Sequence, residues 1–200
     1  MPQPKPNRHQ QRKAATRQTL LEAAREVIVD RGYNEVEILD ITERANVSKA
    51  TFYKHFPNKE AVVREIMLAG FDALVKRIFE GGRRAEVREE WVAESFRDAF
   101  TWAAENRELL LIMVGGRASG QLGAFGRSYL VQHIERGFDE FGLFAETDDG
   151  VPRSLKAHVI AGALIQVLGW WLESDTGYSP SEIADLLQRV LVNGLGPLTR

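Results

Sequence analysis

The sequence of 200 residues contains no cysteine. Disulfides, thiolate zinc sites and cysteine nucleophiles are therefore excluded, and the absence agrees with a reducing cytoplasm. There is also no run of about 18 apolar residues without charges, so we expect no membrane span. The N-terminus is polar and basic and lacks the apolar segment of a secretory signal. Together these absences predict a cytoplasmic protein.

Motifs of the common enzyme classes are missing as well. The four histidines, at positions 9, 55, 133 and 158, do not have metal-ligand spacing such as HExxH. The sequence has no G-x-S-x-G, no phosphate loop and no dinucleotide-binding fingerprint. We therefore expect no catalytic residue, no metal site and no cofactor, and an enzyme is a weak alternative.

Charge is distributed unevenly along the chain. Residues 1–60 carry 11 Lys or Arg and 8 Asp or Glu, whereas residues 61–200 carry 15 and 20. The first 17 residues hold five basic residues and no acidic one. This pattern predicts a basic, flexible arm over residues 1–12, which either binds a polyanion or is only a solvated tail.

Apolar residues recur at intervals of three and four, and no segment alternates with the period of a strand, so we predict an all-α chain of about nine helices. The first contains residues 20–28 and ends at Gly32, where a left-handed residue is favoured. The next two begin at Ile38 and Ser48. A long helix runs from about 58 to 80 and is ended by Gly81 and Gly82. The remaining helices are predicted over 85–105, 107–114, 121–144 and 152–174, and after the Ser179 capping box.

The stretch over residues 38–61 is the most informative part of the chain. It predicts two short helices around a tight turn, in which Asn46 tolerates the left-handed conformation. Ser48 is a good N-cap for the second of these helices. Phe52 and Phe56 are four residues apart, so both can face inward. Such a unit can place its second helix in the major groove of DNA.

The outer face of that second helix carries side chains suited to DNA. Lys49, Ala50 and Thr51 can reach base edges. Tyr53 and His55 can donate to phosphate oxygens. Lys59 lies in the first turn of the next helix, where free N–H groups also attract phosphate. The predicted DNA-binding residues are Ser48, Lys49, Ala50, Thr51, Tyr53, Lys54, His55 and Lys59.

Several motifs match a known family with the right spacing over about residues 12–63. They are Leu20-Leu21-Glu22-Ala23-Ala24, Arg31-Gly32-Tyr33, Asp40-Ile41, Ala45-Asn46-Val47-Ser48, Thr51-Phe52-Tyr53-Lys54-His55-Phe56 and Lys59-Glu60-Ala61. On these residues the segment resembles the DNA-binding domain of TetR/AcrR-type transcriptional regulators. The resemblance implies a three-helix DNA-binding domain over residues 13–60 and a larger helical effector-binding and dimerisation domain over residues 61–200. It also implies a homodimeric repressor that a small-molecule effector releases from double-stranded operator DNA.

The sequence departs from the family pattern at the start of the second helix. Val36 and Glu37 stand where Thr is frequent, and Leu39 stands where a basic residue is common. Asn46 replaces the usual turn glycine. These departures put phosphate contacts from the second helix in question, and the basic arm could compensate for them.

The body of the chain offers two further sets of candidates. Aromatic and polar residues that could line an effector pocket are Phe71, Trp91, Phe96, Met113, His133, Phe138, Gln166 and Trp170. Each such residue is more often plain core than a ligand contact. Apolar residues of the last two helices that could form a four-helix dimer interface are Ile160, Leu164, Val167, Trp171, Ile183, Leu187, Val190 and Leu191. The alternative is that this stripe packs only inside one chain.

Other functions remain open at this point. A transcriptional activator or a ligand sensor with the same fold would have the same sequence features. A sequence-neutral nucleoid protein would need a more basic chain, because nonspecific DNA affinity is almost entirely electrostatic.

Overall fold

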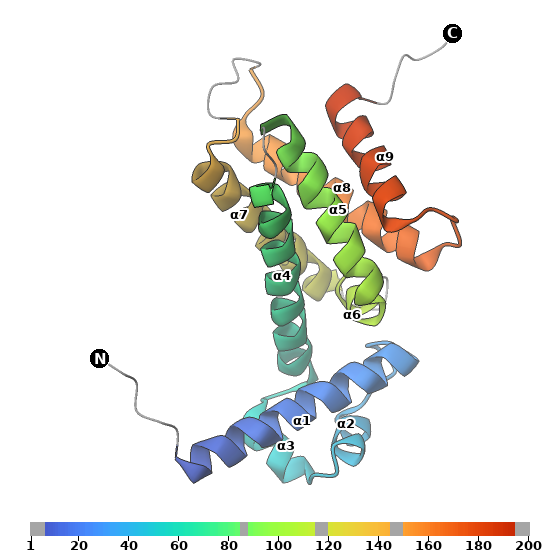
Figure 1. Cartoon of the computed structure of the whole chain (residues 1–200). Coiled ribbons are helices and arrows are strands. Elements are labelled where there is room, and N and C mark those ends of the chain that lie inside the picture. The colour runs from blue at the N-terminus through green and yellow to red at the C-terminus, as the bar shows by residue number, and fades with distance from the viewer. Residues whose placement is uncertain (1–6, 85–87, 115–119, 145–149, 195–200) are drawn as a thin grey trace. The chain divides into compact units, whose positions relative to one another are not determined.

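The computed structural model of the chain describes residues 7–84, 88–114, 120–144 and 150–194. Within these residues the chain forms nine α-helices and no strand (Figure 1), so the all-α prediction is confirmed. The helices are α1 (Arg8–Arg31), α2 (Ile38–Arg44), α3 (Lys49–His55), α4 (Lys59–Arg84), α5 (Arg88–Glu105), α6 (Arg107–Met113), α7 (Gly120–Phe141), α8 (Arg153–Glu173) and α9 (Pro180–Asn193).

The chain divides into two compact units, Met1–Leu68 and Ala69–Arg200, which we call the head and the body. Helix α4 crosses the boundary, so its first ten residues belong to the head and the rest to the body. The compact head therefore extends beyond the predicted boundary at residue 60.

The expected flexible arm is partly helical. Helix α1 begins at Arg8, where Asn7 and Gln10 form a reciprocal capping box. Residues 8–12, predicted to belong to the arm, are therefore part of α1. Residues 1–6 lie outside the described residues.

The head is built around one apolar core to which α1, α2, α3 and the start of α4 all contribute. Its largest fully buried side chains include Leu20, Ile28, Ile41, Phe52 and Phe56. The inward orientation predicted for the two phenylalanines is confirmed. Burying an aromatic or branched side chain of this size contributes roughly 1.5–3 kcal/mol, so the core fixes α3 firmly.

The turns of the head follow their local sequence. Helix α1 ends at Gly32, whose φ is 83°. Asn46 has a φ of 52°, and the N–H of Val47 donates to the carbonyl of Thr42, five residues earlier, as in a Schellman motif. The side-chain oxygen of Ser48 accepts a hydrogen bond from the backbone N–H of Thr51, which confirms Ser48 as the N-cap of α3.

In the body, α5 packs on α9 and α7 packs on α8, while α8 also contacts α5, α6 and α9. The side chains that close the core between them include Phe71, Phe100, Leu110 and Ile112. By length and composition α8 could cross a membrane, but packed helices of globular proteins pass the same test, and α8 is in contact with four helices here.

The predicted end of α4 at Gly81 and Gly82 is wrong, because the helix continues to Arg84. Both glycines lie inside α4 and are buried. A Cβ at Gly81 would lie 2.6 Å from the carbonyl oxygen of Glu94, and one at Gly82 would overlap the indole of Trp91. The pair therefore admits the backbone and a ring of α5 instead of ending the helix.

Candidate nucleic-acid interface and body cavity

Helix α3 presents a polar and basic face to solvent. Lys49, Ala50 and Lys54 are exposed, and the Tyr53 side chain is 56% exposed. The Tyr53 ring rests edge-on against buried Phe52, with 5.6 Å between ring centroids. The exposed face is thus carried on a core-anchored helix, as a rigid reading element requires.

Ser48 and Thr51 are partly engaged within the head. Besides capping the Thr51 N–H, the Ser48 hydroxyl lies 3.0 Å from the Thr51 hydroxyl. One hydroxyl donates to the other, and each keeps further hydrogen-bonding capacity. Their predicted contacts to DNA therefore need no break in the cap.

An open basic hollow lies between α1 and the end of α3. It has a volume of about 410 Å³ and is lined by His9, Arg12, Lys13, Thr16, Lys54 and His55. Sequence reasoning assigned Arg12 to a flexible arm and missed its grouping with α3. The signal that could have found it is the Asn7–Gln10 capping box, which begins α1 before these residues. Such a concentration of cations attracts a polyanion.

His55 sits at the inner edge of this basic hollow. Its Nδ1 atom is buried and has no hydrogen-bond partner within the protein. Burial lowers the pKa of His55 below its ordinary value, and the nearby charges of Lys13, Arg17 and Lys54 lower it further. A phosphate in the hollow would favour the protonated ring instead.

Arg17 joins three elements of the head. Its guanidinium forms an ion pair with Glu65 of α4 and donates to the backbone carbonyl of His55 at 2.7 Å. It also lies 4.1 Å from the centre of the Phe56 ring. Helix α4 is thereby linked through α1 to the end of α3.

The structure does not support the predicted role of Lys59 as a phosphate contact. Its ammonium donates to the backbone carbonyls of Tyr33 at 2.8 Å and Val36 at 2.5 Å. It also lies 4.5 Å from the centre of the Tyr33 ring. Lys59 therefore ties the start of α4 to the loop between α1 and α2, a role that its position in the sequence did not reveal.

The start of α2 carries acidic and apolar groups, as expected from the sequence. Glu37 is exposed, and its backbone N–H donates to the carboxylate of Asp40 at 2.8 Å. This hydrogen bond, together with the ion pair to Arg31, holds the pKa of Asp40 below its usual value. Leu39 is exposed beside them. None of these three side chains supplies a cation for phosphate.

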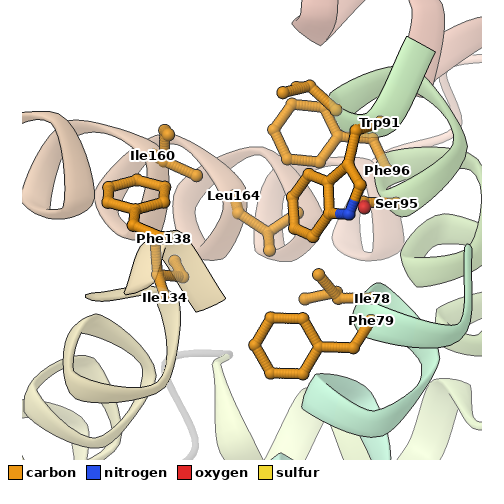
Figure 2. Close-up of a pocket in the computed structure, with 10 residues that line it drawn as sticks. Ile78, Phe79, Trp91, Ser95, Phe96, Ile134, Phe138, Ile160 and Leu164 are labelled. Atoms are coloured by element: carbon orange, nitrogen blue, oxygen red, sulfur yellow. The ribbon is translucent and has the colours of Figure 1, made fainter. Parts of the chain in front are cut away.

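The body contains a small enclosed cavity of about 30 Å³. Side chains from α4, α5, α7 and α8 line it (Figure 2). They are Ile78, Phe79, Trp91, Val92, Ser95, Phe96, Ile134, Phe138, Ile160 and Leu164. Ligand pockets are usually at least about 300 Å³, so this cavity has room for about one water molecule.

Three of the eight predicted pocket residues, Trp91, Phe96 and Phe138, line this cavity. Phe71 and Met113 are buried elsewhere in the body core. The predictions for Gln166 and Trp170 are at odds with the structure, because both side chains face solvent on α8. The remaining lining residues were missed, because they are ordinary core types without a distinctive pattern.

His133 belongs to a different cluster, on the face of α7 toward α4. Its ring stacks on Tyr129 with 4.3 Å between centroids, and its Nδ1 lies 2.9 Å from the Tyr129 carbonyl. The Tyr129 hydroxyl donates to Asp72 of α4, and burial followed by this hydrogen bond raises the pKa of Tyr129 to about 12. His133 is therefore not a polar anchor of the cavity.

Three of the eight residues of the predicted dimer stripe are intramolecular core. Leu164, Ile183 and Leu187 are buried within the body, so they cannot form an exposed interface. Ile160 lines the cavity, Val167, Trp171 and Leu191 are half-buried, and Val190 is exposed. The apolar residues of α8 recur with helical spacing as predicted. The face of α8 that is exposed to solvent, however, is adjacent to the predicted stripe and consists of other residues. That face carries Leu155, Val159, Gly162, Gln166 and Trp170.

Two family models match the chain in order. The model of bacterial regulatory proteins of the tetR family matches residues 20–66, and that of the transcriptional regulator C-terminal region matches residues 90–193. The chain belongs to the TetR family. It is a DNA-binding transcriptional regulator, and the α2–turn–α3 unit of the head is the helix-turn-helix of this TetR-family protein.

Relatives agree with this assignment. The chain is 22% identical over 183 residues to the fatty acid metabolism regulator protein of Bacillus subtilis (strain 168), covering 88% of this chain and 93% of the relative. It is 23% identical over 174 residues to the HTH-type transcriptional regulator YxbF of the same organism, where the match covers 84% of this chain but only 42% of the relative.

The fold is shared with solved structures of the family. The crystal structure of FadR from Bacillus subtilis in complex with stearoyl-CoA superimposes with a TM-score of 0.68 at 21% identity. The superposition covers 90% of this chain and 99% of that one. The TetR-type fold therefore extends through both head and body.

Proposed function

We propose that this TetR-family regulator is a homodimeric repressor that leaves its operator when a small molecule binds in the body. The observation that carries the proposal is the exposed face of α3, held on the head core beside the basic hollow. Lys49, Ala50 and Thr51 read base edges, while Tyr53, Lys54 and His55 hold phosphates. His9, Arg12 and Lys13 of the basic hollow also contact phosphates. Lys59 contacts no phosphate and instead holds the start of α4 to the loop between α1 and α2.

One helix-turn-helix reads few bases, so such modules work in pairs spaced by about one turn of DNA. The outward face of α8 supports a second copy of the chain as the partner. Leu155, Val159 and Trp170 are large apolar side chains in solvent on one side of this helix. Gly162 lies among them with open space around it, which allows close approach of another helix.

The release step uses α4, which has residues in both units. Ile78 and Phe79 of α4 form one wall of the body cavity, while Glu65 of α4 pairs with Arg17 in the head. A ligand larger than the cavity must displace that wall. Displacement of α4 then pulls on α1 and the end of α3, and in a dimer it changes the spacing of the two reading helices. The stearoyl-CoA complex of the Bacillus subtilis regulator supports a ligand site in this fold.

Selection of bound DNA from a random pool tests the proposal. We expect a two-fold symmetric site, a mass of two chains per site, and affinity at least about 10³-fold above that for competitor DNA. Equal binding of all sequences would reject specific regulation.

Two variants separate reading from positioning. Lys49→Ala should lower affinity and relax preference at one base position by about 1–3 kcal/mol. Tyr53→Phe should weaken all sites by a similar factor, since it removes only a phosphate donor. If Lys49→Ala also weakens all sites equally, Lys49 contacts phosphate rather than a base.

A further inference from the structure

We infer that Arg17 is a positioning residue for DNA binding, which holds the C-terminal end of α3 in place and does not itself contact a phosphate. The inference rests on the proposed function in one respect, namely that α3 and the basic hollow meet operator DNA. It goes further by giving a role in DNA binding to a residue that the charge pattern alone would count as a phosphate contact. Glu65 of α4 is the partner of Arg17 in this role.

The guanidinium of Arg17 is already occupied by other groups of the head. Its Nε atom donates to one carboxylate oxygen of Glu65 at 3.0 Å, and its Nη2 atom donates to the other. Its Nη1 atom donates to the backbone carbonyl of His55 at 2.7 Å. A planar guanidinium can form such a fork with a carboxylate and still donate to a third oxygen. Three donors that a phosphate could use are therefore directed at the protein.

The place of Arg17 beside the basic hollow supports the same role. Lys13 and Thr16 of α1 line the hollow, together with Lys54 and His55 of α3. Arg17 lies one turn after Lys13 on α1, yet it is not among the lining residues. The two basic residues thus belong to the same part of α1 but have different surroundings. Lys13 faces the hollow, whereas Arg17 faces a carboxylate of α4.

The hydrogen bond to His55 fixes the end of the helix that is proposed to read DNA. His55 is the last residue of α3, and the last carbonyls of a helix have no partner within it. The partial negative charge at this helix end also favours a cation. Arg17 binds the carbonyl of His55, while the side chain of His55 lines the hollow. Loss of Arg17 would therefore release a side chain that is proposed to hold phosphate.

Arg17 is itself held by a buried ring and by α4. Its guanidinium carbon lies 4.1 Å from the centre of the Phe56 ring, and Phe56 is only 1% exposed. Glu65 belongs to the part of α4 that lies within the head. Arg17 thus joins a core ring, a carboxylate of α4 and the end of α3. Groups that are ordered before binding lose less conformational entropy on binding, so this cluster should raise operator affinity.

Operator affinity and its salt dependence test the inference in the full chain. The operator is the sequence selected from the random pool, and the competitor is a scrambled duplex of the same length. Arg17→Gln should lower operator affinity by about tenfold, the usual effect of lost hydrogen bonds from a charged group. It should leave unchanged the slope of log affinity against log salt concentration, because no phosphate contact is lost. The matched control is Lys13→Gln, which should make that slope shallower by about one.

Arg17→Lys and Glu65→Gln separate positioning from phosphate binding. Lysine binds phosphate well but lacks the planar fork, so Arg17→Lys should lose nearly as much operator affinity as Arg17→Gln. Glu65→Gln removes a negative charge, so electrostatics alone would strengthen binding to all DNA. We expect operator affinity to fall by about threefold instead, without a fall in competitor affinity. Circular dichroism checks that each variant is folded. If Arg17→Gln does not fold, the direction of the Glu65→Gln effect decides.

Three results would overturn the inference. They are a shallower salt slope in Arg17→Gln, an Arg17→Lys variant that binds the operator like the wild type, or a Glu65→Gln variant that binds the operator more tightly. Wild-type binding in the same samples separates this failure from that of the proposed function. A wild-type protein that prefers no sequence rejects the proposed function and the inference with it. A wild-type protein whose preference survives Arg17→Gln unchanged rejects the positioning role alone.

Discussion

The side chains of the head that are proposed to contact DNA lie on the surface of a closed apolar core. The side chains of the body that are proposed to contact a ligand line an internal cavity. Lys49, Tyr53 and Lys54 project from α3 into solvent. In the body, apolar side chains such as Ile134, Phe138 and Leu164 line a cavity of about 30 Å³. The head thus presents its groups to solvent before DNA arrives, whereas the body cavity is much smaller than an ordinary ligand pocket.

The glycines of the two regions differ in the same way. Gly32 in the head has a φ of 83° and no neighbour within 4 Å of an added Cβ, so backbone conformation requires it. Gly82 in the body is helical, and the Trp91 ring occupies the place of its side chain. The need for glycine at position 32 is set by the local backbone conformation. The need for glycine at position 82 is set by the packing of α5 against α4.

The largest expected loss of stability comes from substituting Gly82, which allows the Trp91 ring to pack against α4. Gly82→Ala adds a methyl group whose Cβ would lie 2.2 Å from the Trp91 indole, so the cost of overpacking should be at the upper end of its usual range, about 3 kcal/mol. Helix propensity offsets up to about 1 kcal/mol, so we expect a net destabilisation of about 2 kcal/mol. All four tryptophans lie in the body, so denaturation followed by tryptophan fluorescence measures the effect there.

Gly123→Ala is the control for this substitution. Its added Cβ would meet only the flexible guanidinium of Arg127 at 3.5 Å, so the variant should be neutral or slightly stabilised. If Gly82→Ala behaves like Gly123→Ala, or if its cost persists after Trp91→Ala, the ring is not what requires the glycine.

A smaller effect is expected at the turn of the head, where the backbone and not a neighbour sets the requirement. Asn46 has a φ of 52°, so Asn46→Ala should cost about 1 kcal/mol. Asn46→Gly should cost little, because glycine adopts this conformation freely. Hydrogen exchange of the α2 and α3 amides measures both. Equal losses in the two variants would mean that the Asn46 side chain matters and its backbone does not.

The same contrast explains what the sequence could predict. Asn46, Ser48 and the capping box at Ser179 act on neighbours within a few residues, so these turns and helix starts were predicted correctly. Gly81 and Gly82 carry the same local signal as a helix end, yet they admit α5 from a distant part of the chain. No local pattern distinguishes the two cases.

For the candidate sites, side-chain chemistry was predictable and its geometry was not. A lysine at the start of α4 suits phosphate, but the carbonyls of Tyr33 and Val36 hold Lys59 inside the head. The apolar stripe of α8 was correctly found, but Leu164 is core, and Trp170, assigned to the pocket, faces solvent. The sequence determines the period of a helix, while its neighbours decide which face is buried.

The smallest expected effect concerns proton binding at His55. Its pKa is lowered by burial first and then by Lys13, Arg17 and Lys54, so the neutral ring is favoured in the free protein. A phosphate in the basic hollow would favour the protonated ring, so DNA binding should take up protons. Operator affinity should therefore rise between pH 7.5 and 6.0, by at most about threefold, since a full pKa unit corresponds to tenfold.

His55→Gln should flatten this pH dependence, because glutamine does not titrate in this range. The control is His158→Gln, a change of an exposed side chain on α8 of the body, which should keep the pH dependence. In the free protein the sign is opposite: the stability of the head should fall as pH drops through about 6.5, because the unfolded chain then binds the proton more readily. Operator affinity that falls on acidification in parallel with stability would place the phosphate away from His55.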